Sequence, residues 1–459
     1  MLQTLHIGVD DTDSMNGMCT TYLATLMVDF LLEYPVKFLD FPKLIRLNPN
    51  IPYKTRGNGA VAITFTGAEE IEEEIWKGMI DLLKKYSDVN DPNTNPGLVF
   101  LKGEITPPIR KLYNQCLYQV VPLNLVKQLL GKHISVKNFF MKNGRGLIGA
   151  TAAIGADLSN DYTFELIAYR DPNLKRPERL IDIQSVTTAD KNNPLSFNNY
   201  DYENNQVMIS PHGPDPVFCG IRGETSDGVI NMWKSIKILE PVQTTMIFRS
   251  NQHTQVHLKK EFLGTEIKPY LSVIVRGVVS KEPQDYPGGH VIFSIKSGPA
   301  SIDCAAYEPT KRFRKIVREL IIGDEIMVLG GVRPASRTTP LTINIEEFQI
   351  IQLRSKYKQI TPKCPLCGAS LTSAGKTQGF KCKKCSYTSL KKEYIKIPIS
   401  RKIRGGVRYV IPICAQRHLT KPVTRDLSLQ FHIPTICDFQ KAFYSFLKKR
   451  EQLNNHIVS

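Results

Sequence analysis

Two pairs of cysteines near the C-terminal end constrain the fold of this 459-residue chain more than any other feature. Cys364 and Cys367 form the first Cys-x₂-Cys pair, Cys382 and Cys385 form the second, and fourteen residues separate the two pairs. Thiolates at this spacing are typical of a tetrahedral Zn²⁺ site in a zinc ribbon. Because four thiolates leave no open coordination position, we expect the metal to be structural and not catalytic.

The remaining cysteines follow no framework spacing, which indicates a reducing compartment and not a disulfide-stapled protein. No stretch of about 18 apolar residues occurs, so we expect no membrane span. Asp10 and Asp11 fall where the apolar core of a secretory signal would lie. We therefore expect a cytoplasmic protein. The six scattered cysteines are Cys19, Cys116, Cys219, Cys304, Cys414 and Cys437.

The positive charge of the chain is concentrated in its last quarter. The formal net charge is +17, and residues 354–459 carry 22 Lys/Arg against four Asp/Glu. The first 353 residues carry 38 Lys/Arg and 39 Asp/Glu and are therefore nearly neutral. This asymmetry favours a polyanion such as RNA as the partner of the C-terminal part.

Residues 5–34 predict a strand, a carboxylate-rich turn and the first turn of a helix. The turn contains Asp10, Asp11 and Asp13, which repel one another unless a cation lies among them. Mg²⁺ is the ion that such oxygen ligands favour. The alternative is an acidic surface turn with N-capping side chains. The helix start offers free backbone N–H groups to a phosphate, next to Ser14, Gly17, Cys19, Thr20 and Thr21.

A second candidate segment spans residues 48–59 and combines prolines, glycines and cations. Lys54 and Arg56 would supply positive charge to a triphosphate, and Gly57 and Asn58 lie directly after them. The segment does not match the Walker A spacing. The alternative is an ordinary surface loop.

Short predicted strands dominate residues 271–353, with one helix over residues 311–320 between the third and the fourth strand. This order is expected of an OB-fold barrel, a fold that often binds single-stranded nucleic acid. Lys311, Arg312 and Arg314 lie on the polar faces of the helix. The alternative is a barrel used only for packing. A closing helix is predicted over residues 439–453 and an irregular polar loop over residues 182–202.

Two further loops carry candidate binding groups. In the stiff Pro/Gly-rich loop 211–223, Asp215 could bind a cation and Arg222 could bind an anion. The alternative is that this loop is a purely structural turn. Residues 415–422 contain Arg417, His418 and Lys421, which suit base edges and phosphates. A solvated basic loop is the alternative for this second segment.

Taken together, these segments resemble one family, the archaeal tRNA-isoleucine 2-agmatinylcytidine synthetases, over nearly the whole chain. The resemblance includes residues 8–14, 17–21, 46–52 and 54–58 and continues through residues 144–146, 214–218, 288–290, 307–310, 364–385 and 417–419. Tyr53 stands where many members are expected to have Trp, and an aromatic ring is kept.

The resemblance implies a multidomain α+β protein with five parts. These are an atypical threonine-kinase-like α/β domain over residues 1–140, a ferredoxin-like domain over 141–258, an OB-fold β-barrel over 263–355, a zinc ribbon with a basic segment over 360–435 and a C-terminal helix over 436–459.

The family resemblance also implies the reaction. ATP phosphorylates C2 of the wobble cytidine of a tRNA-isoleucine with a CAU anticodon, and the primary amine of agmatine then displaces the phosphate to give 2-agmatinylcytidine. It implies autophosphorylation of Thr20, and we expect a monomer. Phosphorylating the C2 oxygen converts a poor leaving group into a good one, and an anticodon base can be extruded into a pocket.

The candidate residues fall into four groups under this hypothesis. Asp10, Asp11, Asp13 and Thr20 are catalytic, with the three aspartates on Mg²⁺; Ser14, Gly17, Cys19, Thr21, Lys54, Arg56, Gly57 and Asn58 bind ATP; Asp215, Phe218 and Arg222 bind agmatine; and Lys311, Arg312, Arg314, Lys383, Lys384, Arg417, His418 and Lys421 bind tRNA.

Two other function classes remain open on the residues alone. One is a single-stranded nucleic-acid-binding protein built on the OB-fold and zinc ribbon, which leaves the acidic cluster unexplained. The other is a Mg²⁺-dependent RNA phosphotransferase or nuclease.

Overall fold

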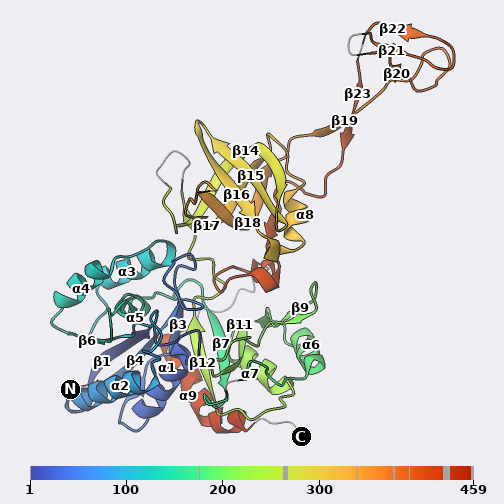
Figure 1. Ribbon diagram of the computed structural model, residues 1–459. Coiled ribbons are helices and arrows are strands. Elements are labelled where there is room, and N and C mark those ends of the chain that lie inside the picture. Colours follow the sequence, from blue (N-terminus) through green and yellow to red (C-terminus); the bar gives the residue numbers. More distant parts are fainter. Residues whose placement is uncertain are drawn as a thin grey trace.

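The computed structural model describes residues 2–174, 176–261, 267–337, 339–375, 378–391, 393–426 and 435–455. It shows a mixed α/β multidomain chain with a large sheet, a β-barrel and a small four-cysteine ribbon, which lie in that order across Figure 1. The first residues of the predicted OB-fold, 263–266, and residues 427–434 of the predicted basic segment lie outside the described residues. Within the described residues, no helix has the length and apolar character needed to cross a bilayer.

One ten-stranded sheet runs through the first 250 residues. Its strand order is β6-β5-β1-β4-β3-β12-β7-β11-β8, and β2 pairs with β4. The parallel contact between β3 and β12 joins the N-terminal half of the sheet to the half built from residues 163–250. The strands are β1 (Leu2–Asp10), β2 (Lys37–Phe38), β3 (Lys43–Arg46), β4 (Gly59–Ala68), β5 (Gly97–Lys102), β6 (Val136–Phe140), β7 (Thr163–Tyr169), β8 (Ser196–Phe197), β11 (Val217–Gly223) and β12 (Thr244–Ser250).

Alternating side chains of these strands feed two cores, one on each face of the sheet. In β5, Leu98 and Phe100 pack into the first core, whereas Val99 and Leu101 pack into the second. Helices α1 (Thr20–Leu31) and α2 (Glu72–Tyr86) cover the first face, and α3 (Pro107–Tyr118), α4 (Leu123–Gly131) and α5 (Gly146–Ile154) cover the second. A short 3₁₀ turn, η1 (Glu69–Ile71), precedes α2.

Helix α5 follows the predicted boundary at residue 140, yet it packs against β1 and β5 of the first predicted domain. Two glycines permit this close approach. A Cβ at Gly8 would lie 2.1 Å from the carbonyl oxygen of Ala150, and a Cβ at Gly97 would lie 2.1 Å from the backbone nitrogen of Leu147. The predicted first and second domains therefore share a sheet and a core.

The region predicted as an irregular loop, residues 182–202, contains regular structure instead. It holds α6 (Ile183–Asn192), strand β8 and the start of a small hairpin formed by β9 (Tyr200–Asp201) and β10 (Gln206–Val207). The side chain of Asp182 caps α6 by accepting hydrogen bonds from the backbone N–H groups of Gln184 and Ser185. The prediction was wrong because the helix buries only Val186 and Ala189, next to α7 (Ser226–Ser235).

Residues 272–352 form a closed five-stranded barrel. Strand β14 (Ser272–Tyr286) pairs with both β15 (His290–Ser297) and β17 (Glu325–Arg333), which closes the ring. The parallel pair of β16 (Ala300–Ala306) and β18 (Thr342–Gln352) completes it. The predicted helix 311–320 is shorter than expected, with η2 (Glu308–Thr310) and α8 (Phe313–Val317); Lys311 between them has a φ of 47°, which no continuous α-helix allows. Strand β13 (Lys259–Lys260) adds to the edge at β14.

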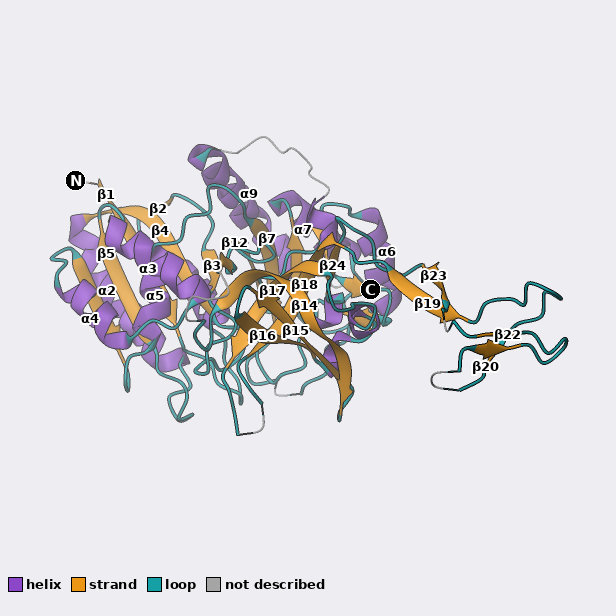
Figure 2. Cartoon of the chain, turned by 90° about the horizontal axis from the view of Figure 1, so that it is seen from above, coloured by secondary structure: helices purple, strands orange, loops and turns teal. Residues whose placement is uncertain are grey.

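The four-cysteine ribbon stands away from the barrel on a two-stranded arm, as Figures 1 and 2 both show. The arm pairs β19 (Lys356–Ile360) with β23 (Ile395–Ile399), and Ile360 lies directly opposite Ile395. The ribbon itself contains β20 (Thr372–Ser373), β21 (Phe380–Lys381) and β22 (Thr388–Ser389) around a small core.

After the ribbon, the chain returns to the body of the molecule. Strand β24 (Arg408–Val410) pairs with β18, and the 3₁₀ turns η3 (Ile413–Ala415) and η4 (Val423–Asp426) follow. Helix α9 (Ile436–Asn454) packs against the large sheet, where Phe443 contacts Phe38 and Phe41. The N- and C-terminal segments therefore share one hydrophobic core.

Candidate functional site

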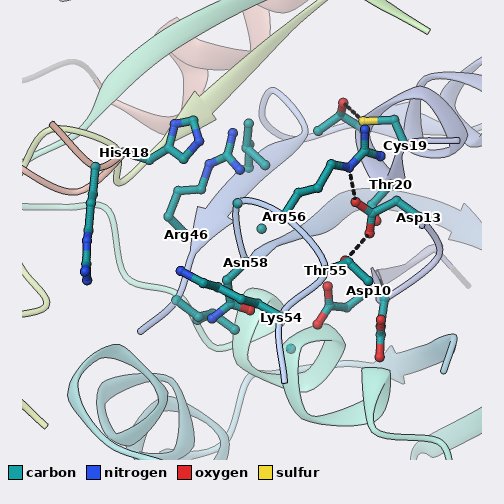
Figure 3. A pocket seen from close by; sticks show the side chains of 18 of the residues that line it. Asp10, Asp13, Cys19, Thr20, Arg46, Lys54, Thr55, Arg56, Asn58 and His418 are labelled. Carbon is teal, nitrogen blue, oxygen red and sulfur yellow. Dashed lines mark hydrogen bonds and ion pairs between the residues drawn. The ribbon is translucent and has the colours of Figure 1, made fainter. Parts of the chain in front are cut away.

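A cavity of about 840 Å³ lies where the acidic turn meets the second half of the large sheet and the returning C-terminal segment. Figure 3 shows Asp10, Asp13 and Thr20 on one side of it and Arg46 and His418 on the other. The structure therefore brings together groups that lie far apart in the sequence. The predicted residues that line it are Asp10, Asp11, Asp13, Cys19, Thr20, Thr21, Lys54, Arg56, Gly57, Asn58, Asp215, Arg222, Arg417 and His418.

Three of the residues predicted to bind ATP or agmatine do not line this cavity. Ser14 donates a hydrogen bond of 2.5 Å to Asp88 and forms an isolated bridge with Gly17, so both shape the turn behind the site. Phe218 is fully buried in the core of the sheet. These three residues are placed to support the cavity wall and not to touch a ligand inside it.

The acidic side of the cavity is built at the end of β1. Burial, together with the neighbouring Asp11, raises the pKa of Asp10 well above its ordinary value. Gly149 in α5 makes room for this carboxylate, because a Cβ at that position would lie 1.9 Å from Asp10 Oδ2. The small-residue helix α5 is thus a wall of the site.

Asp11 lies in the left-handed region, with a φ of 59°, and its carboxylate is 3.6 Å from a guanidinium nitrogen of Arg145. Burial raises the pKa of Asp11 to about 6, and the charge of Arg145 opposes this rise. The Arg145 guanidinium also lies over the ring of Tyr53, 5.0 Å from its centroid. Tyr53 thus contacts a residue of the acidic side.

One guanidinium, that of Arg56, connects two carboxylates in the cavity. Arg56 Nε donates to Asp13 at 2.8 Å, and Arg56 Nη1 lies 2.7 Å from Asp215. Thr55 also donates to Asp13, at 3.1 Å, and Arg179 lies 3.5 Å from Asp215. The loop after β3 is thereby fastened to both the acidic turn and the loop before β11.

Thr20 is the first residue of α1 and is 5% exposed at the cavity wall. Its hydroxyl oxygen accepts a 3.0 Å hydrogen bond from Thr12. Among the described residues, no side chain caps this helix start, whose preceding residue is Cys19. The backbone N–H groups of the first turn are therefore available to an anionic group beside Thr20.

The C-terminal segment supplies the last part of the wall. Arg417 lies 3.7 Å from Glu346 of the barrel and donates to Asn50. Lys54 donates to the carbonyl oxygen of Pro49, and burial together with Arg417 lowers the pKa of Lys54 to about 8. Sheet, barrel and C-terminal segment therefore meet at this site.

The other predicted tRNA contacts lie outside the cavity. Arg312 is exposed and pairs with Glu203 at 3.0 Å, whereas Arg314 donates to Gly289 and pairs with Glu308 at 3.3 Å, so it braces the barrel. Lys311 is exposed next to them. Lys383 and Lys384 are exposed on the ribbon, and Lys421 lies 3.6 Å from Asp161 beside a second cavity.

The concentration of positive charge in the last quarter of the chain suggests an exposed basic surface, but four of its arginines form ion pairs instead. They bind carboxylates of the body and thereby fasten the returning chain to it. The pairs are Arg401 with Asp324 at 2.5 Å, Arg408 with Glu347 at 2.7 Å, Arg425 with Glu224 at 2.6 Å, and Arg450 with Asp29.

The four paired cysteines form a site that fits one zinc ion. Their ligand atoms all lie within 4.8 Å of one another. The Sγ atoms of Cys364 and Cys385 are 3.4 Å apart, and those of Cys367 and Cys382 are 3.5 Å apart. Tetrahedral zinc with bonds of about 2.3 Å requires sulfur atoms about 3.8 Å apart, so the thiols fit structural Zn²⁺.

The three aspartates of the acidic turn do not form such a group. Among the described residues, only the four cysteines bring three or more metal-binding side chains this close together. Asp13 is already occupied by Arg56 and Thr55. The acidic side thus suits an ion that takes one or two carboxylates and completes its shell with substrate phosphates and water, as Mg²⁺ does.

Sequence reasoning missed several residues of the site. Arg46, Glu165 and His253 line the cavity, and Arg145 and Gly149 shape its acidic side. The available signals were the small-residue run around Gly149 and a charged residue, Glu165, inside an otherwise apolar strand. Neither signal identifies its partner without the fold.

Comparison with known proteins agrees with this architecture. Three family models match: the TiaS TCKD domain over residues 6–142, the TiaS FLD domain over residues 144–257 and the TiaS C-terminal zinc ribbon domain over residues 361–403. The tRNA-isoleucine 2-agmatinylcytidine synthetase TiaS of Methanocaldococcus jannaschii is 43% identical over 428 residues, which cover 91% of this chain and 98% of that protein. The Pyrococcus horikoshii protein of the same name is 41% identical, with 91% and 96% covered.

Solved structures give the same result. The crystal structure of TiaS in complex with its isoleucine tRNA and ATP is 38% identical, with a TM-score of 0.83, and 94% of this chain and 99% of that chain are covered. The fold and site thus define a multidomain α/β protein with a zinc ribbon and a cavity lined by both carboxylates and cationic side chains. The chain belongs to the tRNA-isoleucine 2-agmatinylcytidine synthetase (TiaS) family.

Proposed function

We infer that the protein is an ATP-dependent synthetase that attaches agmatine to a cytidine of an isoleucine tRNA. Two relatives that align with 91% of the chain are named as 2-agmatinylcytidine synthetases of an isoleucine tRNA. Similar structures were solved with this tRNA and ATP, and with this tRNA, AMPCPP and agmatine. The observation in this molecule that carries the proposal is that one cavity is lined by the acidic turn, Thr20 and cations from four separate segments. Such a cavity can hold a nucleotide phosphate, a base and a small cation together.

We propose that the phosphates of ATP lie between the start of α1 and the acidic turn. Asp10 and Asp11 would hold Mg²⁺ together with the phosphate oxygens, and Lys54 would balance phosphate charge. Asp13 positions Arg56 through their 2.8 Å contact. Mg²⁺ supplies charge neutralisation at the transferred phosphoryl group.

The reaction order follows the chemistry of cytosine. The phosphoryl group is transferred to the C2 oxygen, and the primary amine of agmatine then attacks C2 and displaces phosphate. Thr20, with its hydroxyl at the free N–H groups of α1, is the residue proposed to accept a phosphoryl group itself. Its buried position beside Thr12 restricts the phosphoryl donor to a nucleotide in this cavity.

Asp215 is the proposed anchor for the guanidinium of agmatine. Asp215 already pairs with the guanidinium of Arg56 at 2.7 Å, and this observation supports the proposal that the guanidinium of agmatine binds the same carboxylate. Arg222 carries the same charge as agmatine and pairs with Glu165 at 3.1 Å, so it is a poor direct contact for that substrate. Phe218 acts only by packing beneath the loop.

The domain labels are part of the same proposal. Residues 1–140 are a threonine-kinase-like unit and residues 141–258 a ferredoxin-like unit. The closed barrel, in which β14 pairs with β17 and β16 runs parallel to β18, is an OB-fold. The exposed lysines of the ribbon contact the backbone of the tRNA. This tRNA has a CAU anticodon. The protein works as a cytoplasmic monomer.

Mass spectrometry of nucleosides tests the proposed function. Purified protein is incubated with the isoleucine tRNA, ATP, Mg²⁺ and agmatine, and the digested tRNA is searched for a cytidine that carries agmatine. The adduct must be absent when ATP or agmatine is omitted. Strand cleavage without an adduct would favour the nuclease alternative, and tRNA binding without ATP consumption would favour the binding-protein alternative.

A further inference from the structure

Four side chains gather at the side of the cavity away from Asp10 and Asp13, and we refer to them as the basic end. They are Arg46 of β3, Arg222 of β11, His253 after β12 and His418 of the returning C-terminal segment. Figure 3 shows Arg46 and His418 there. Apart from the ion pair between Arg222 and Glu165, these four side chains have no part in the proposed reaction steps.

The charges at the basic end are not balanced. The side chains of Arg46 and Arg222 are only 14% and 16% exposed, and a single carboxylate, Glu165, contacts both of them. Glu165 lies 3.8 Å from Arg46 and 3.1 Å from Arg222, and it also accepts a hydrogen bond from Gln252. Two guanidiniums therefore share one carboxylate, and the field in this part of the cavity attracts an anion.

His253 adds a hydrogen-bond acceptor to this field. Its Nδ1 lies 2.8 Å from the carbonyl oxygen of Thr420, so Nδ1 carries the proton and donates. Its Nε2 is buried and has no hydrogen-bond partner within the described part of the chain, although the residue is only 3% exposed and lines the cavity. Burial and the charge of Arg222 lower the pKa of His253 to about 3, so the ring is neutral and Nε2 is able to accept a hydrogen bond from a hydroxyl group.

Gly57 places the basic end next to the acidic side. A Cβ at this position would lie 2.6 Å from Arg46 Nη1 and 3.0 Å from His418 Nε2. The preceding residue, Arg56, already contacts Asp13. The basic end and the acidic side are therefore neighbouring parts of one cavity, linked by the backbone of Gly57 and the side chain of Arg56.

A ligand that suits the basic end carries an anion for the two guanidiniums and a hydroxyl donor for His253. A ribose–phosphate unit has both groups. Agmatine is excluded because it is cationic like Arg46 and Arg222, and the Mg²⁺-bound phosphates of ATP are better placed at Asp10 and Asp11. The remaining source of this chemistry among the substrates is the RNA chain itself.

We propose that the basic end binds the ribose and a flanking phosphate of the tRNA nucleotide whose base enters the cavity. This proposal rests on the proposed function for its substrate. It assigns Arg46 and Arg222 to the phosphate and His253 to a ribose hydroxyl. The base would then project across Gly57 toward the acidic side, where its C2 oxygen meets the phosphoryl group.

Binding of altered anticodon stem-loops tests the proposal with the full-length protein. One probe carries an uncharged methylphosphonate at either linkage that flanks the wobble nucleotide, and a second lacks its 2′-hydroxyl. The wild-type protein should bind one methylphosphonate probe about 10-fold more weakly than the unmodified stem-loop. In Arg222→Gln the same change should cost only about three-fold, because the Arg222 contact is already lost and only the Arg46 contact remains.

Matched variants separate this contact from general effects. Arg276→Gln alters an exposed arginine on β14 that pairs with Glu325, and it should show the full penalty of about 10-fold. His253→Phe should lose sensitivity to the missing 2′-hydroxyl while it keeps sensitivity to the methylphosphonate, which provides a second test if Arg222→Gln does not fold.

Three results would be decisive. The proposal would be overturned if Arg222→Gln lost as much affinity for the methylphosphonate probe as the wild-type protein does, and His253→Phe lost as much for the probe without the 2′-hydroxyl. An increased KM for ATP in Arg222→Gln, with an unchanged methylphosphonate penalty, would assign the anion to ATP and overturn the RNA assignment. The third result is that the variants lose their sensitivity to the modified probes as expected, but the wild-type protein forms no agmatine adduct. This result would support the binding of RNA at the basic end and would contradict the proposed function.

Discussion

Arg56 and Asp215 form an ion pair of 2.7 Å inside the cavity, although they belong to different halves of the large sheet. The same guanidinium also binds Asp13. The pair therefore sets the distance between the acidic turn and the loop before β11, which are proposed to hold ATP and agmatine.

Replacing Arg56 with Ala should lower stability and activity together. Asp13 and Asp215 are mostly buried and would lose their shared cation, at a cost of about 3 kcal/mol in the free energy of unfolding. Urea unfolding measures the stability loss, and the KM for agmatine should rise. Arg56→Lys keeps the positive charge but loses the planar guanidinium that contacts both carboxylates, so its defect should be intermediate. Arg276→Ala is the exposed control, and equal stability of Arg56→Ala and this control would refute the structural role.

Asp11→Asn should stop ATP consumption while tRNA binding persists. The substitution keeps the shape of the side chain and removes the charge that would hold Mg²⁺, so turnover should fall by about 100-fold or more. ATP hydrolysis in the presence of tRNA and an electrophoretic binding assay measure the two effects. Asp81→Asn on the exposed face of α2 serves as the control. Normal turnover by Asp11→Asn would remove this aspartate from the metal site.

Gly149→Ala should disturb the catalytic side without an equal loss of fold. The new Cβ would lie 1.9 Å from Asp10 Oδ2, so the carboxylate must leave its position. We expect a loss of kcat of about 10-fold or more and a largely unchanged far-UV circular dichroism spectrum. Gly131→Ala is the matched control, because a Cβ at this last position of α4 meets nothing within 4 Å among the described residues. Equal activity of the two variants would contradict the role of α5 as a wall of the site.

Removing the ribbon should weaken tRNA binding without unfolding the body. Ile360 and Ile395 are paired neighbours, so residues 361–394 can be replaced by a two-residue Asn-Gly turn between β19 and β23. The deleted segment contains seven lysines and one glutamate. The affinity for tRNA should fall about 10-fold and depend less steeply on salt. The binding of ATP in the absence of tRNA should not change.

The cut must lie inside the arm and not at residue 354. A truncation there would also remove α9 and the arginines that bind Asp324, Glu347 and Glu224, so it would unfold the body. Lys383→Gln/Lys384→Gln keeps the zinc ligands and tests the charge contribution alone. Unchanged salt dependence in both forms would exclude the ribbon from the contact with the tRNA backbone.

Acid should destabilise the large sheet through His6. Burial lowers the pKa of His6 from 6.5 to about 4, and the charges of Lys43 and Arg110 add to this shift, whereas the 3.0 Å hydrogen bond between the ring and the carbonyl oxygen of Gly103 opposes it. Between these pH values the unfolded chain binds a proton that the folded chain does not. The free energy of unfolding therefore falls as the pH decreases from 6.5 to about 4, by up to about 1.4 kcal/mol per pH unit from this residue.

Urea midpoints at about pH 7.5, 6 and 5 measure the effect. His6→Gln removes the titrating group, so its midpoint should depend less on pH over this range. Parallel curves for His6→Gln and the wild-type protein would show that His6 is not the source of the acid sensitivity.

Local patterns were sufficient where neighbours in the sequence make the structure. The spacing of Cys364 to Cys385 predicts one metal site, and their Sγ atoms meet as expected. The strand, acidic turn and helix around Asp10 and Thr20 also form as predicted, with α1 ending at Leu31. The five barrel strands are found in the predicted order, because side-chain alternation is a property of each strand by itself.

Local patterns failed where burial came from distant partners. Helix α6 looks like a polar loop because only Val186 and Ala189 face its neighbour. Helix α3, which begins with Pro107, was not predicted from the sequence. The C-terminal charge was interpreted as an RNA-binding surface, but several of its arginines bind carboxylates far away in the sequence.

The sequence alone determined the chemistry available to this protein: four thiolates for zinc, clustered carboxylates at a helix start, and a cationic C-terminal part. Only the tertiary structure decided which of these groups meet. It placed His418 and Arg417 beside Arg46 and Asp10 in one cavity and withdrew Phe218 from it. The physical reason is that spacing along a chain fixes local geometry, whereas the pairing of strands and the packing of α9 into a shared core fix the distances between remote side chains.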